Sequence, residues 1–320
     1  MVEAISAKAS RLISPRGAML VALGLIALIA GAIGLTSFAT GYVIYIVNLV
    51  MVAIVLALGL HIVIGECGQF SLAHAAFYGI GIYTAGLVTN LLGAPFWLSL
   101  LAGGLVAGLI GFFIGFLSLR MRDIYLALST FAFGEAMQWL FLNWTPVTGG
   151  PNGLNIKPAT LFGFQFLTDR AAFPLVLSVT LVILALVAVL HVSTLGRSLR
   201  AVRESEIAAA SVGINVTRMK LTAFTLSAFV AGLAGGLYTT FSTFIHPDSL
   251  GFQTTIIILT TVVVGGMGSL IGAVGGAMVF GLLSELLRQV PSYQEMIYGG
   301  ILILFMMYAP RGMFSFVGRR

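Results

Sequence analysis

The chain has 320 residues and a formal net charge of +6, with 59% hydrophobic and only 8% charged residues. Because a soluble domain carries about 25% charged residues, this composition excludes a soluble globular protein, and the single cysteine excludes an intrachain disulfide framework. What remains is a protein that crosses a membrane several times.

Ten segments are apolar and long enough to be considered as spans, since a membrane-spanning helix needs about 20 mostly apolar residues. They are 18–35, 42–64, 70–92, 97–119, 124–144, 173–192, 221–244, 252–264, 269–287 and 294–309. We therefore expect an all-α transmembrane bundle of about ten spans, with a range of eight to ten. The range reflects the glycine-rich run from Val262 to Gly276, which predicts a broken helix or a re-entrant segment.

The basic residues give this topology an orientation, because cytoplasmic loops of membrane proteins collect Lys and Arg. With both termini in the cytoplasm, the external loops hold only Lys157, Arg170 and Arg288. The other basic residues all fall on the cytoplasmic side: Lys8, Arg11, Arg16, Arg120, Arg122, Arg197, Arg200, Arg203, Arg218, Lys220, Arg311, Arg319 and Arg320. This asymmetry predicts cytoplasmic N and C termini.

The expected organisation is one transmembrane domain over residues 18–310, between a cytoplasmic N-terminal segment (1–17) and a cytoplasmic tail (311–320). Two polar loops interrupt it on opposite sides of the membrane. The external loop 145–172 is rich in Gly, Pro, Asn and Thr, whereas the cytoplasmic loop 193–220 is rich in Arg and Glu.

Glycines spaced four residues apart predict close helix packing, because one helical turn separates the two members of each pair. The pairs are Gly104 and Gly108, Gly111 and Gly115, Gly232 and Gly236, Gly268 and Gly272, and Gly272 and Gly276. We expect most of these pairs to pack against other helices of the same chain.

Catalytic motifs are absent from the sequence. None of the three lysines follows a glycine, which excludes a Gly-x-x-x-x-Gly-Lys phosphate-binding loop. The few histidines and aspartates are scattered and form no metalloprotease or serine-hydrolase motif. An enzyme is therefore disfavoured, and no cofactor or metal is expected in this chain.

The cytoplasmic loop contains a predicted short helix over Ser205–Val212, with Gly213 as its stop. A helix of about two turns is marginal alone in water, so we expect its own membrane domain or a partner to hold it. Its small alanines leave a flat surface, and the charged residues around it provide charge for docking of a partner. The candidate docking residues are Arg200, Arg203, Glu204, Glu206, Ala208, Ala209 and Gly213.

Four polar residues inside predicted spans or at the edge of one are candidates for a transport pathway. Glu135 lies deep in its segment, where a charge costs ~2.5–3.5 kcal/mol, so we expect it to be protonated, paired or facing a cavity. His74 either links two helices or contacts substrate. Gln69 and Ser71 are expected to cap the third span, whose N-terminus is also suited to a substrate carboxylate.

The pattern Glu206-x-Ala208-Ala209-x-x-x-Gly213 resembles the EAA loop of permease subunits of ABC importers. Further stretches resemble, in order, successive motifs of the branched-chain amino-acid permease family, most closely its LivM-type subunit. They are Gly65–Tyr83, Asp123–Glu135, Thr148–Leu154 and Leu221–Tyr238. The resemblance covers roughly residues 55–310 and implies a multi-pass permease of the bacterial inner membrane.

This resemblance also implies a set of partners. A second permease subunit would complete the pathway in the lipid bilayer. Two cytoplasmic ATPase subunits, which use ATP and Mg²⁺, would dock on the loop 193–220. An external solute-binding protein would meet the loop 145–172 at Thr148, Gly149, Gly150 and Asn152. No nucleic acid is implied.

The substrate implied by the resemblance is leucine, isoleucine or valine, or a related small solute. The residues Glu66, Cys67 and Ala73 depart from the family pattern, which leaves a permease for urea or amides as an alternative. An ion-coupled secondary transporter is a second alternative, although it calls for several buried carboxylates. Glu66 lies near the end of a segment and is expected to reach water.

Overall fold

The computed structural model describes residues 34, 39–119, 121, 123–161, 164–288, 291–308 and 312–313. The chain divides into two compact units, Met1–Ile44 and Tyr45–Arg320, and the candidate sites all lie in the second. Apart from Gly34, the predicted span 18–35 falls outside the described residues, as do the predicted N-terminal segment and most of the predicted C-terminal tail.

Long helices account for most of the described chain, which confirms the all-α class. They are α3 (Gly41–Leu60), continued by the π-helix η1 (His61–Glu66), α4 (His74–Leu92), α5 (Phe96–Ser118), α6 (Asp123–Asn143), α8 (Asp169–Val192), α11 (Val216–Tyr238), α12 (Phe252–Gly266), α13 (Leu270–Leu287) and α14 (Pro291–Tyr308). Each predicted segment from 42–64 to 294–309 coincides with one of these helices.

Seven helical stretches of the described chain are long and apolar enough to cross a membrane: Gly41–Glu66, His74–Leu92, Phe96–Leu117, Asp169–Val192, Val216–Tyr238, Pro247–Gly266 and Leu270–Leu287. This finding supports a polytopic membrane protein but does not confirm ten spans, since α6 and α14 are not among the seven. The cytoplasmic position of the termini stays a prediction.

The glycine-rich region after residue 251 is a broken helical element. The helix α12 has 15 residues, which span about 22 Å, less than the ~30 Å hydrocarbon core of a bilayer. It reaches spanning length only together with the preceding 3₁₀-helix η3 (Pro247–Leu250). A short turn then leads into α13, as the glycines of this region predict.

Glycines bring α11 close to α5. A Cβ atom added at Gly232 would lie 2.5 Å from the carbonyl oxygen of Gly103, and one added at Gly115 would lie 2.9 Å from the Cβ of Phe224. Likewise, a Cβ at Gly272 on α13 would lie 2.5 Å from the carbonyl oxygen of Gly265 on α12. The predicted packing role of the glycine pairs is thus confirmed in these contacts.

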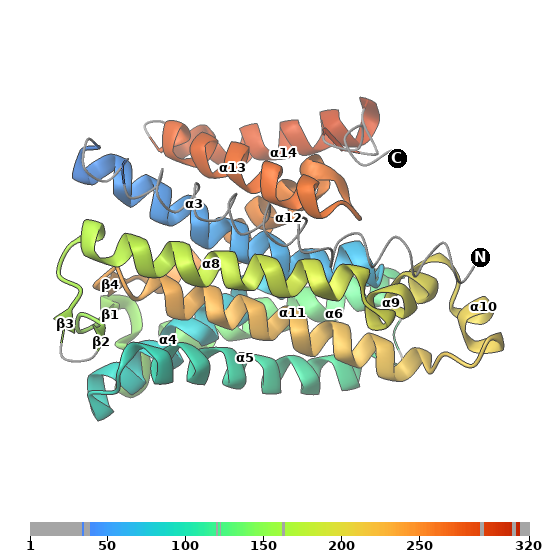
Figure 1. The fold of residues 1–320 in the computed structure, drawn as a ribbon, viewed down its shortest axis with the longest axis horizontal. Coiled ribbons are helices and arrows are strands. Elements are labelled where there is room, and N and C mark those ends of the chain that lie inside the picture. Colours follow the sequence, from blue (N-terminus) through green and yellow to red (C-terminus); the bar gives the residue numbers. More distant parts are fainter. Residues whose placement is uncertain are drawn as a thin grey trace, which may run out of the picture. The chain divides into compact units, whose positions relative to one another are not determined.

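The two polar loops lie at opposite ends of the helical bundle (Figure 1). At one end the chain forms α9 (Thr194–Glu204) and α10 (Glu206–Ser211). The other end holds the small elements α7 (Thr145–Thr148), η2 (Gly150–Asn152), β1 (Leu154–Asn155), β2 (Thr160–Leu161), β3 (Phe164–Gln165) and β4 (Phe244–Ile245). Opposite ends are what the predicted topology requires.

The region 193–220 is more helical than its sequence suggested. The helix α9 was not predicted, and α11 begins at Val216, five residues before the predicted start at 221. The physical reason lies in tertiary packing: Leu199 and Val202 are buried on one face of α9. A short polar helix with one apolar stripe is stable when that stripe is covered.

Candidate functional site

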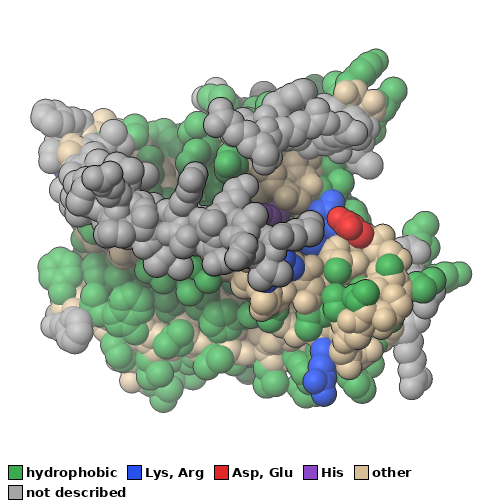
Figure 2. Space-filling model, turned by 45° about the vertical axis from the view of Figure 1, so that its right-hand side comes forward, with side chains coloured by type: hydrophobic (Ala, Val, Ile, Leu, Met, Phe, Trp, Pro, Cys, Tyr) green, Lys and Arg blue, Asp and Glu red, His purple; other side chains and the backbone are tan. Residues whose placement is uncertain are grey.

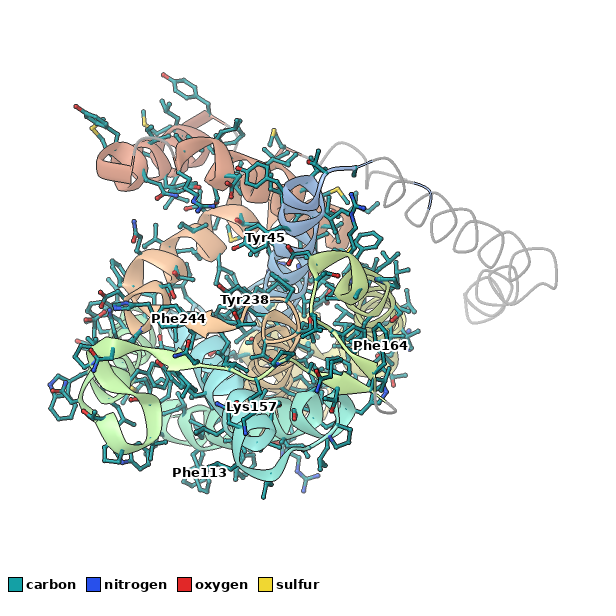
Figure 3. All side chains as sticks on the ribbon, turned by 90° about the vertical axis from the view of Figure 1, so that its left-hand side faces the viewer. Tyr45, Phe113, Lys157, Phe164, Tyr238 and Phe244 are labelled. Atoms are coloured by element: carbon teal, nitrogen blue, oxygen red, sulfur yellow. The ribbon has the colours of Figure 1, made fainter. Side chains whose placement is uncertain are left out.

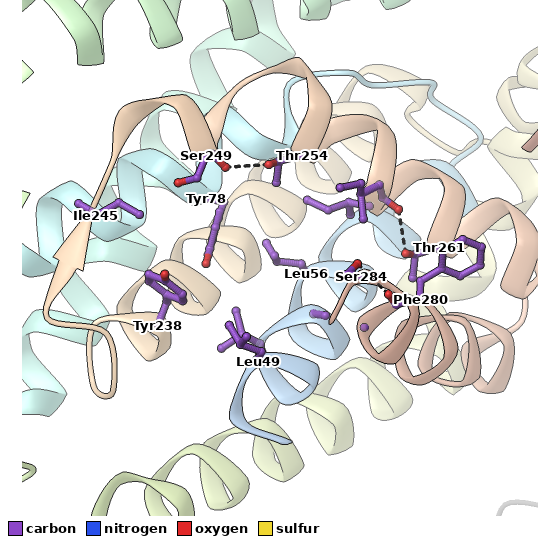
Figure 4. Close-up of a pocket in the computed structure, with 15 residues that line it drawn as sticks. Leu49, Leu56, Tyr78, Tyr238, Ile245, Ser249, Thr254, Thr261, Phe280 and Ser284 are labelled. Atoms are coloured by element: carbon purple, nitrogen blue, oxygen red, sulfur yellow. Dashed lines mark hydrogen bonds between the residues drawn. The ribbon is translucent and has the colours of Figure 1, made fainter. Parts of the chain in front are cut away.

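An apolar cavity of about 230 Å³ lies among α3, α4, α11, α12 and α13 (Figure 4). The rings of Tyr78 and Tyr238 lie at one end of it, and Phe280 and Ser284 lie toward the other. Its remaining wall is mainly aliphatic and includes Leu56 of α3. A cavity of this lining suits a small apolar group.

The hydroxyl groups around this cavity differ in whether they already form a hydrogen bond within the chain. Thr254 donates to the carbonyl of Ser249 at 2.7 Å, and Thr261 donates to the carbonyl of Ile257 at 2.8 Å. The hydroxyls of Tyr78 and Tyr238 have no hydrogen-bond partner among the described residues, and their rings lie 6.1 Å apart. The cavity therefore offers apolar space together with two available phenol hydroxyls.

His74 lies outside the cavity lining but holds part of its wall. Its ring is buried, and Nε2 donates to the carbonyl oxygen of Leu56 at 2.9 Å. This bond joins the first residue of α4 to α3, so His74 links two helices, one of the two roles that the sequence left open. His74 would affect a transport pathway only indirectly, by fixing the position of Leu56 in the cavity wall.

Gln69 and Ser71 do not cap α4, contrary to our expectation. The N-cap residue is Ala73, and no side chain caps the helix. Ser71 is buried and accepts a hydrogen bond from the Ala73 amide at 3.4 Å, whereas Gln69 lines a second cavity of about 290 Å³ beside α10. Sequence proximity to His74 thus brings neither residue to the first cavity.

Glu135 points out of the chain rather than into it. It is exposed on α6, about 18 Å along the helix from its first residue. Exposed Leu128 and Trp139 lie on the same helical face. No ion pair joins Glu135 to another described residue, so this face of α6 combines apolar side chains with one deep carboxylate.

The predicted short helix is confirmed as α10. The hydroxyl of Ser205 caps it by accepting from the Ala208 amide at 3.2 Å, and Gly213 follows with φ +84°, a conformation that glycine adopts without strain. An ion pair of 2.6 Å between Glu206 and Lys220 fastens α10 to α11. The Lys220 side chain is only 7% exposed, so this pair is partly desolvated.

Some of the predicted docking residues bond other parts of the chain, and others are exposed without such bonds among the described residues. Arg200, Arg203 and Glu206 bind other parts of their own chain. Ala209 is buried, while Glu204, Ala208 and Gly213 are exposed. Two apolar residues that the sequence did not single out, Ile207 and Val212, are 85% and 75% exposed on this tip. Exposed apolar side chains on a polar end are typical of a docking surface.

A cluster of four charged or titratable side chains joins three helices near α9. The carboxylate of buried Glu66 accepts from Arg200 at 2.6 Å, lies 3.2 Å from Nε2 of His61 and hydrogen-bonds Nδ1 of His191. The expectation that Glu66 reaches water is wrong, because the π-helix η1 turns its side chain inward, where only 2% of it is exposed. We call these four residues the Glu66 cluster.

The Glu66 cluster also contains a set of metal-ligand atoms. His61, Glu66 and His191 present such atoms within 4.8 Å of one another. The guanidinium of Arg200, however, lies 2.6 Å from Glu66 and 3.2 Å from Nδ1 of His191. The chain therefore supplies its own cation to this carboxylate.

Few charged side chains appear elsewhere on the surface that Figure 2 shows. Among the side chains that it colours, hydrophobic ones prevail, and most of the visible Lys, Arg, Asp and Glu gather toward the end formed by α9 and α10. Beneath these two helices, Cys67 is buried in a small core with Leu199, Val202 and Ala209. Burial raises the pKa of the Cys67 thiol to about 12.

The opposite end is held by backbone pairing. The strands β1 and β4 pair antiparallel, with Leu154 opposite Ile245, and the side chain of Asn90 bonds both Asn155 and Lys157. Figure 3 looks onto this end, where Lys157, Phe164 and Phe244 are marked. These contacts fix the polypeptide that follows α6.

The predicted contact residues for a binding protein have different roles in this loop. Thr148 is buried, and its hydroxyl donates to the carbonyl of Phe141 at 2.7 Å. Gly149 and Gly150 form the turn with φ values of +76° and +56°. Asn152 is exposed. Of the four, Asn152 is therefore the one whose side chain faces outward.

Comparisons with known proteins bear on the whole chain. Residues 42–306 match the family described as "Branched-chain amino acid transport system / permease component". The high-affinity branched-chain amino acid transport system permease protein LivM of Salmonella typhimurium is 38% identical over 84% of this chain and 69% of its own length. LivH of Escherichia coli is 26% identical over 80% of this chain and 89% of its own length. The fructose import permease protein FrcC of Rhizobium meliloti is 29% identical over 68% of this chain and 64% of its own length. No solved structure matches the chain.

Proposed function

Since the chain belongs to the permease-component family of branched-chain amino-acid transport systems, we propose that it carries leucine, isoleucine or valine as one membrane subunit of an ATP-driven importer. It is a multi-pass protein of the bacterial inner membrane and a transport component rather than an enzyme. The energy of transport comes from ATPase subunits, which bind the ATP and Mg²⁺.

The cavity between α3, α4, α11, α12 and α13 is the observation that supports this substrate class. Its aliphatic wall matches the branched side chain, and its volume of about 230 Å³ suits a small apolar group. The available hydroxyls of Tyr78 and Tyr238 are positioned to receive hydrogen bonds from, or donate them to, the polar end of the amino acid.

The same cavity disfavours sugars, urea and amides. Such solutes are recognised through many hydrogen bonds, and unpaired polar groups in a desolvated site are costly. The hydroxyls of Thr254, Thr261 and Ser284 already donate to backbone carbonyls. The lining contains no charged residue, which also weakens the case for an ion-coupled transporter.

We place the second permease subunit on the exposed face of α6. A carboxylate at the depth of Glu135 is unfavourable against lipid, at ~2.5–3.5 kcal/mol, so a protein or water-lined surface there is preferred. The exposed side chains of Leu128 and Trp139 would supply apolar contact on either side of it. Glu135 would then lie beside the pathway shared by the two subunits.

We place the two soluble partners at opposite ends of the bundle. An ATPase subunit would receive α10 through the exposed side chains of Ile207 and Val212, with Glu204 and Ala208 beside them. The solute-binding protein would meet the end that carries Asn152. This arrangement uses the two polar loops for different contacts.

Uptake by vesicles that contain the complete transporter tests the proposed substrate. ATP-dependent accumulation of leucine, competed by isoleucine and valine but not by ribose or urea, is the expected result. Ala53→Leu, which adds bulk to the cavity wall, should lower leucine uptake by about tenfold. Ala185→Leu on the exposed face of α8 is the matched control and should leave uptake unchanged. Accumulation of ribose or urea in place of leucine would refute the proposal.

A further inference from the structure

We propose that the Glu66 cluster fastens α9 to α3, so that movement of the ATPase-bound tip at α10 is passed to the wall of the transport cavity. This inference rests on the proposed function, because it assumes that an ATPase moves α10. It assigns Glu66 and Arg200 as positioning residues that link energy supply to transport.

The first link is the buried carboxylate itself. Glu66 belongs to the π-helix that ends α3, His191 belongs to the end of α8, and Arg200 belongs to α9. The Glu66 side chain is 2% exposed, so water cannot replace a lost partner. A desolvated ion pair with further hydrogen bonds holds its elements in one geometry, because separating the charges leaves one of them buried alone.

A second link lies one turn further along α9. Arg203 donates from Nη1 to the carbonyl oxygen of Gly65, beside Glu66. Its side chain also passes close to two turns: a Cβ added at Gly68 would lie 2.7 Å from Cγ of Arg203, and one added at Gly268 would lie 2.6 Å from its Nη1. The second turn joins α12 to α13, so Arg200 and Arg203 bring α9 against the end of α3 and against the turn between two further helices that line the cavity.

The path continues along α3 to the cavity. Leu56, Ala53 and Leu49 line the cavity from this helix, and Leu56 lies about 15 Å from Glu66 along the helix axis. His74 fixes this part of α3 to α4 through the Leu56 carbonyl. The π-helix carries two residues of the cluster, His61 and Glu66, and continues directly from the part of α3 that lines the cavity; such segments frequently occur at functional sites.

The path begins at α10, which only Ser205 separates from α9. The Glu206–Lys220 pair fastens α10 to α11 in addition. When an ATPase displaces α10, α9 therefore moves with it. Whether α3 moves as well depends on the contacts of the Glu66 cluster. A rigid connection of this kind is a physical link between two sites, whose strength is measured as a coupling between them.

Two variants of the complete transporter test the link, each with the same readout. Glu66→Gln removes the buried negative charge. Arg200→Gln removes the cation that pairs with it, and the Arg200 side chain is the more exposed of the two. Both should lower the ratio of leucine taken up to ATP hydrolysed by about tenfold, while ATP hydrolysis by the complex is retained. Arg197→Gln is the matched control, because Arg197 lies on the same helix but bonds only the Val192 carbonyl among the described residues; it should keep the wild-type ratio.

The single cysteine supplies an independent readout. Cys67 follows Glu66 and packs against Leu199 and Val202 of α9, so its alkylation by a maleimide reports separation of α9 from the bundle. Labelling should be slow in the wild type with and without ATP, and at least about tenfold faster in Glu66→Gln and Arg200→Gln. This comparison holds whatever solute is transported, and therefore separates failure of the link from failure of the proposed substrate.

Three results would overturn the proposal. The first is a wild-type ratio of uptake to hydrolysis in both variants. The second is Cys67 labelling that stays as slow in both variants as in the wild type. The third is one bound zinc ion per chain in the purified wild-type transporter that Arg200→Gln retains and Glu66→Gln loses, which would make the cluster a metal site.

Discussion

The two polar loops, 145–172 and 193–220, are equally long but differ in the polar contacts that fasten them to the bundle. The first is held by backbone pairing of β1 with β4 and by the amide of Asn90. The second is held by ion pairs, Glu66 with Arg200 and Glu206 with Lys220. Both ion pairs connect a short helix of the loop to a long helix of the bundle.

This difference suggests a division of labour between the ends. Ion pairs in a partly desolvated site are strong but few, so a small displacement either carries the partner along or breaks the connection completely. Backbone pairing and the amide bonds of Asn90 spread the restraint over several weaker bonds, and the loss of one of them leaves no buried charge. An end that transmits force is better served by the first arrangement, and an end that presents a fixed surface is better served by the second.

Reversing the charge of Glu206 should have a larger effect on uptake than any other change at these two ends. Glu206→Lys places a second ammonium beside Lys220 and expels α10 from its position. We expect leucine uptake to fall by about a hundredfold, with normal insertion into the membrane. Uptake by vesicles and the amount of inserted protein are the measurements.

The charge swap is the control for this variant. Glu206→Lys combined with Lys220→Glu restores an ion pair in reverse and should recover a large part of the lost uptake. Equal loss in the single and double variants would show that the pair does not hold α10.

A change at Gly213 tests the same end through the backbone alone. A Cβ at this position meets nothing within 4 Å, but the φ of +84° is unfavourable for a branched residue. Gly213→Val should destabilise the end of α10 by about 1–2 kcal/mol and weaken ATPase binding, as measured by pull-down of the ATPase subunits. Gly213→Asn, which tolerates this conformation, should lose much less; equal losses would refute a conformational role.

The opposite end should respond more weakly to loss of one side chain. Asn90→Ala removes bonds to Asn155 and Lys157, each worth about 1 kcal/mol. We expect faster hydrogen exchange confined to residues 154–157 and weaker stimulation by the binding protein. The uptake-to-hydrolysis ratio should stay as in the wild type. A lower ratio would contradict the claim that this end presents a fixed surface and does not couple ATP hydrolysis to transport.

The smallest effect concerns the pH dependence of Cys67 labelling. Burial raises the pKa of this thiol to about 12, so the reactive thiolate is only about one part in ten thousand at pH 8. Maleimide labelling of the folded wild type should remain slow from pH 7 to pH 9, because the whole range lies well below the pKa. The rate should rise about tenfold per pH unit over this range without levelling off, and a rate that levels off above about pH 8.5 would mean that the thiol is exposed.

Apolar length predicted the long helices well because burial in lipid is decided by local composition. The break between α12 and α13 was also visible, since glycines at 265, 266, 268 and 272 interrupt the run. The helix α9 was missed because its composition is polar. Its Leu195, Leu199 and Val202 nevertheless recur at helical spacing, and that pattern alone indicates one buried face.

The site was less predictable for a physical reason. Glu66 and Arg200 are 134 positions apart, and nothing in a single sequence pairs them. A carboxylate at the end of a long apolar run was the only local indication, and we expected it to reach water. The cavity residues Tyr78 and Tyr238 likewise come from separate helices, so only their packing brings them together.

The most direct test of coupling through the α9–α10 end is the ratio of leucine taken up to ATP hydrolysed, measured for variants at the two ends of one reconstituted transporter. We predict a lower ratio for Arg200→Gln and Glu206→Lys and an unchanged ratio for Asn90→Ala. Equal ratios in all three, or a loss confined to Asn90→Ala, would contradict the claim that the α9–α10 end couples ATP to transport.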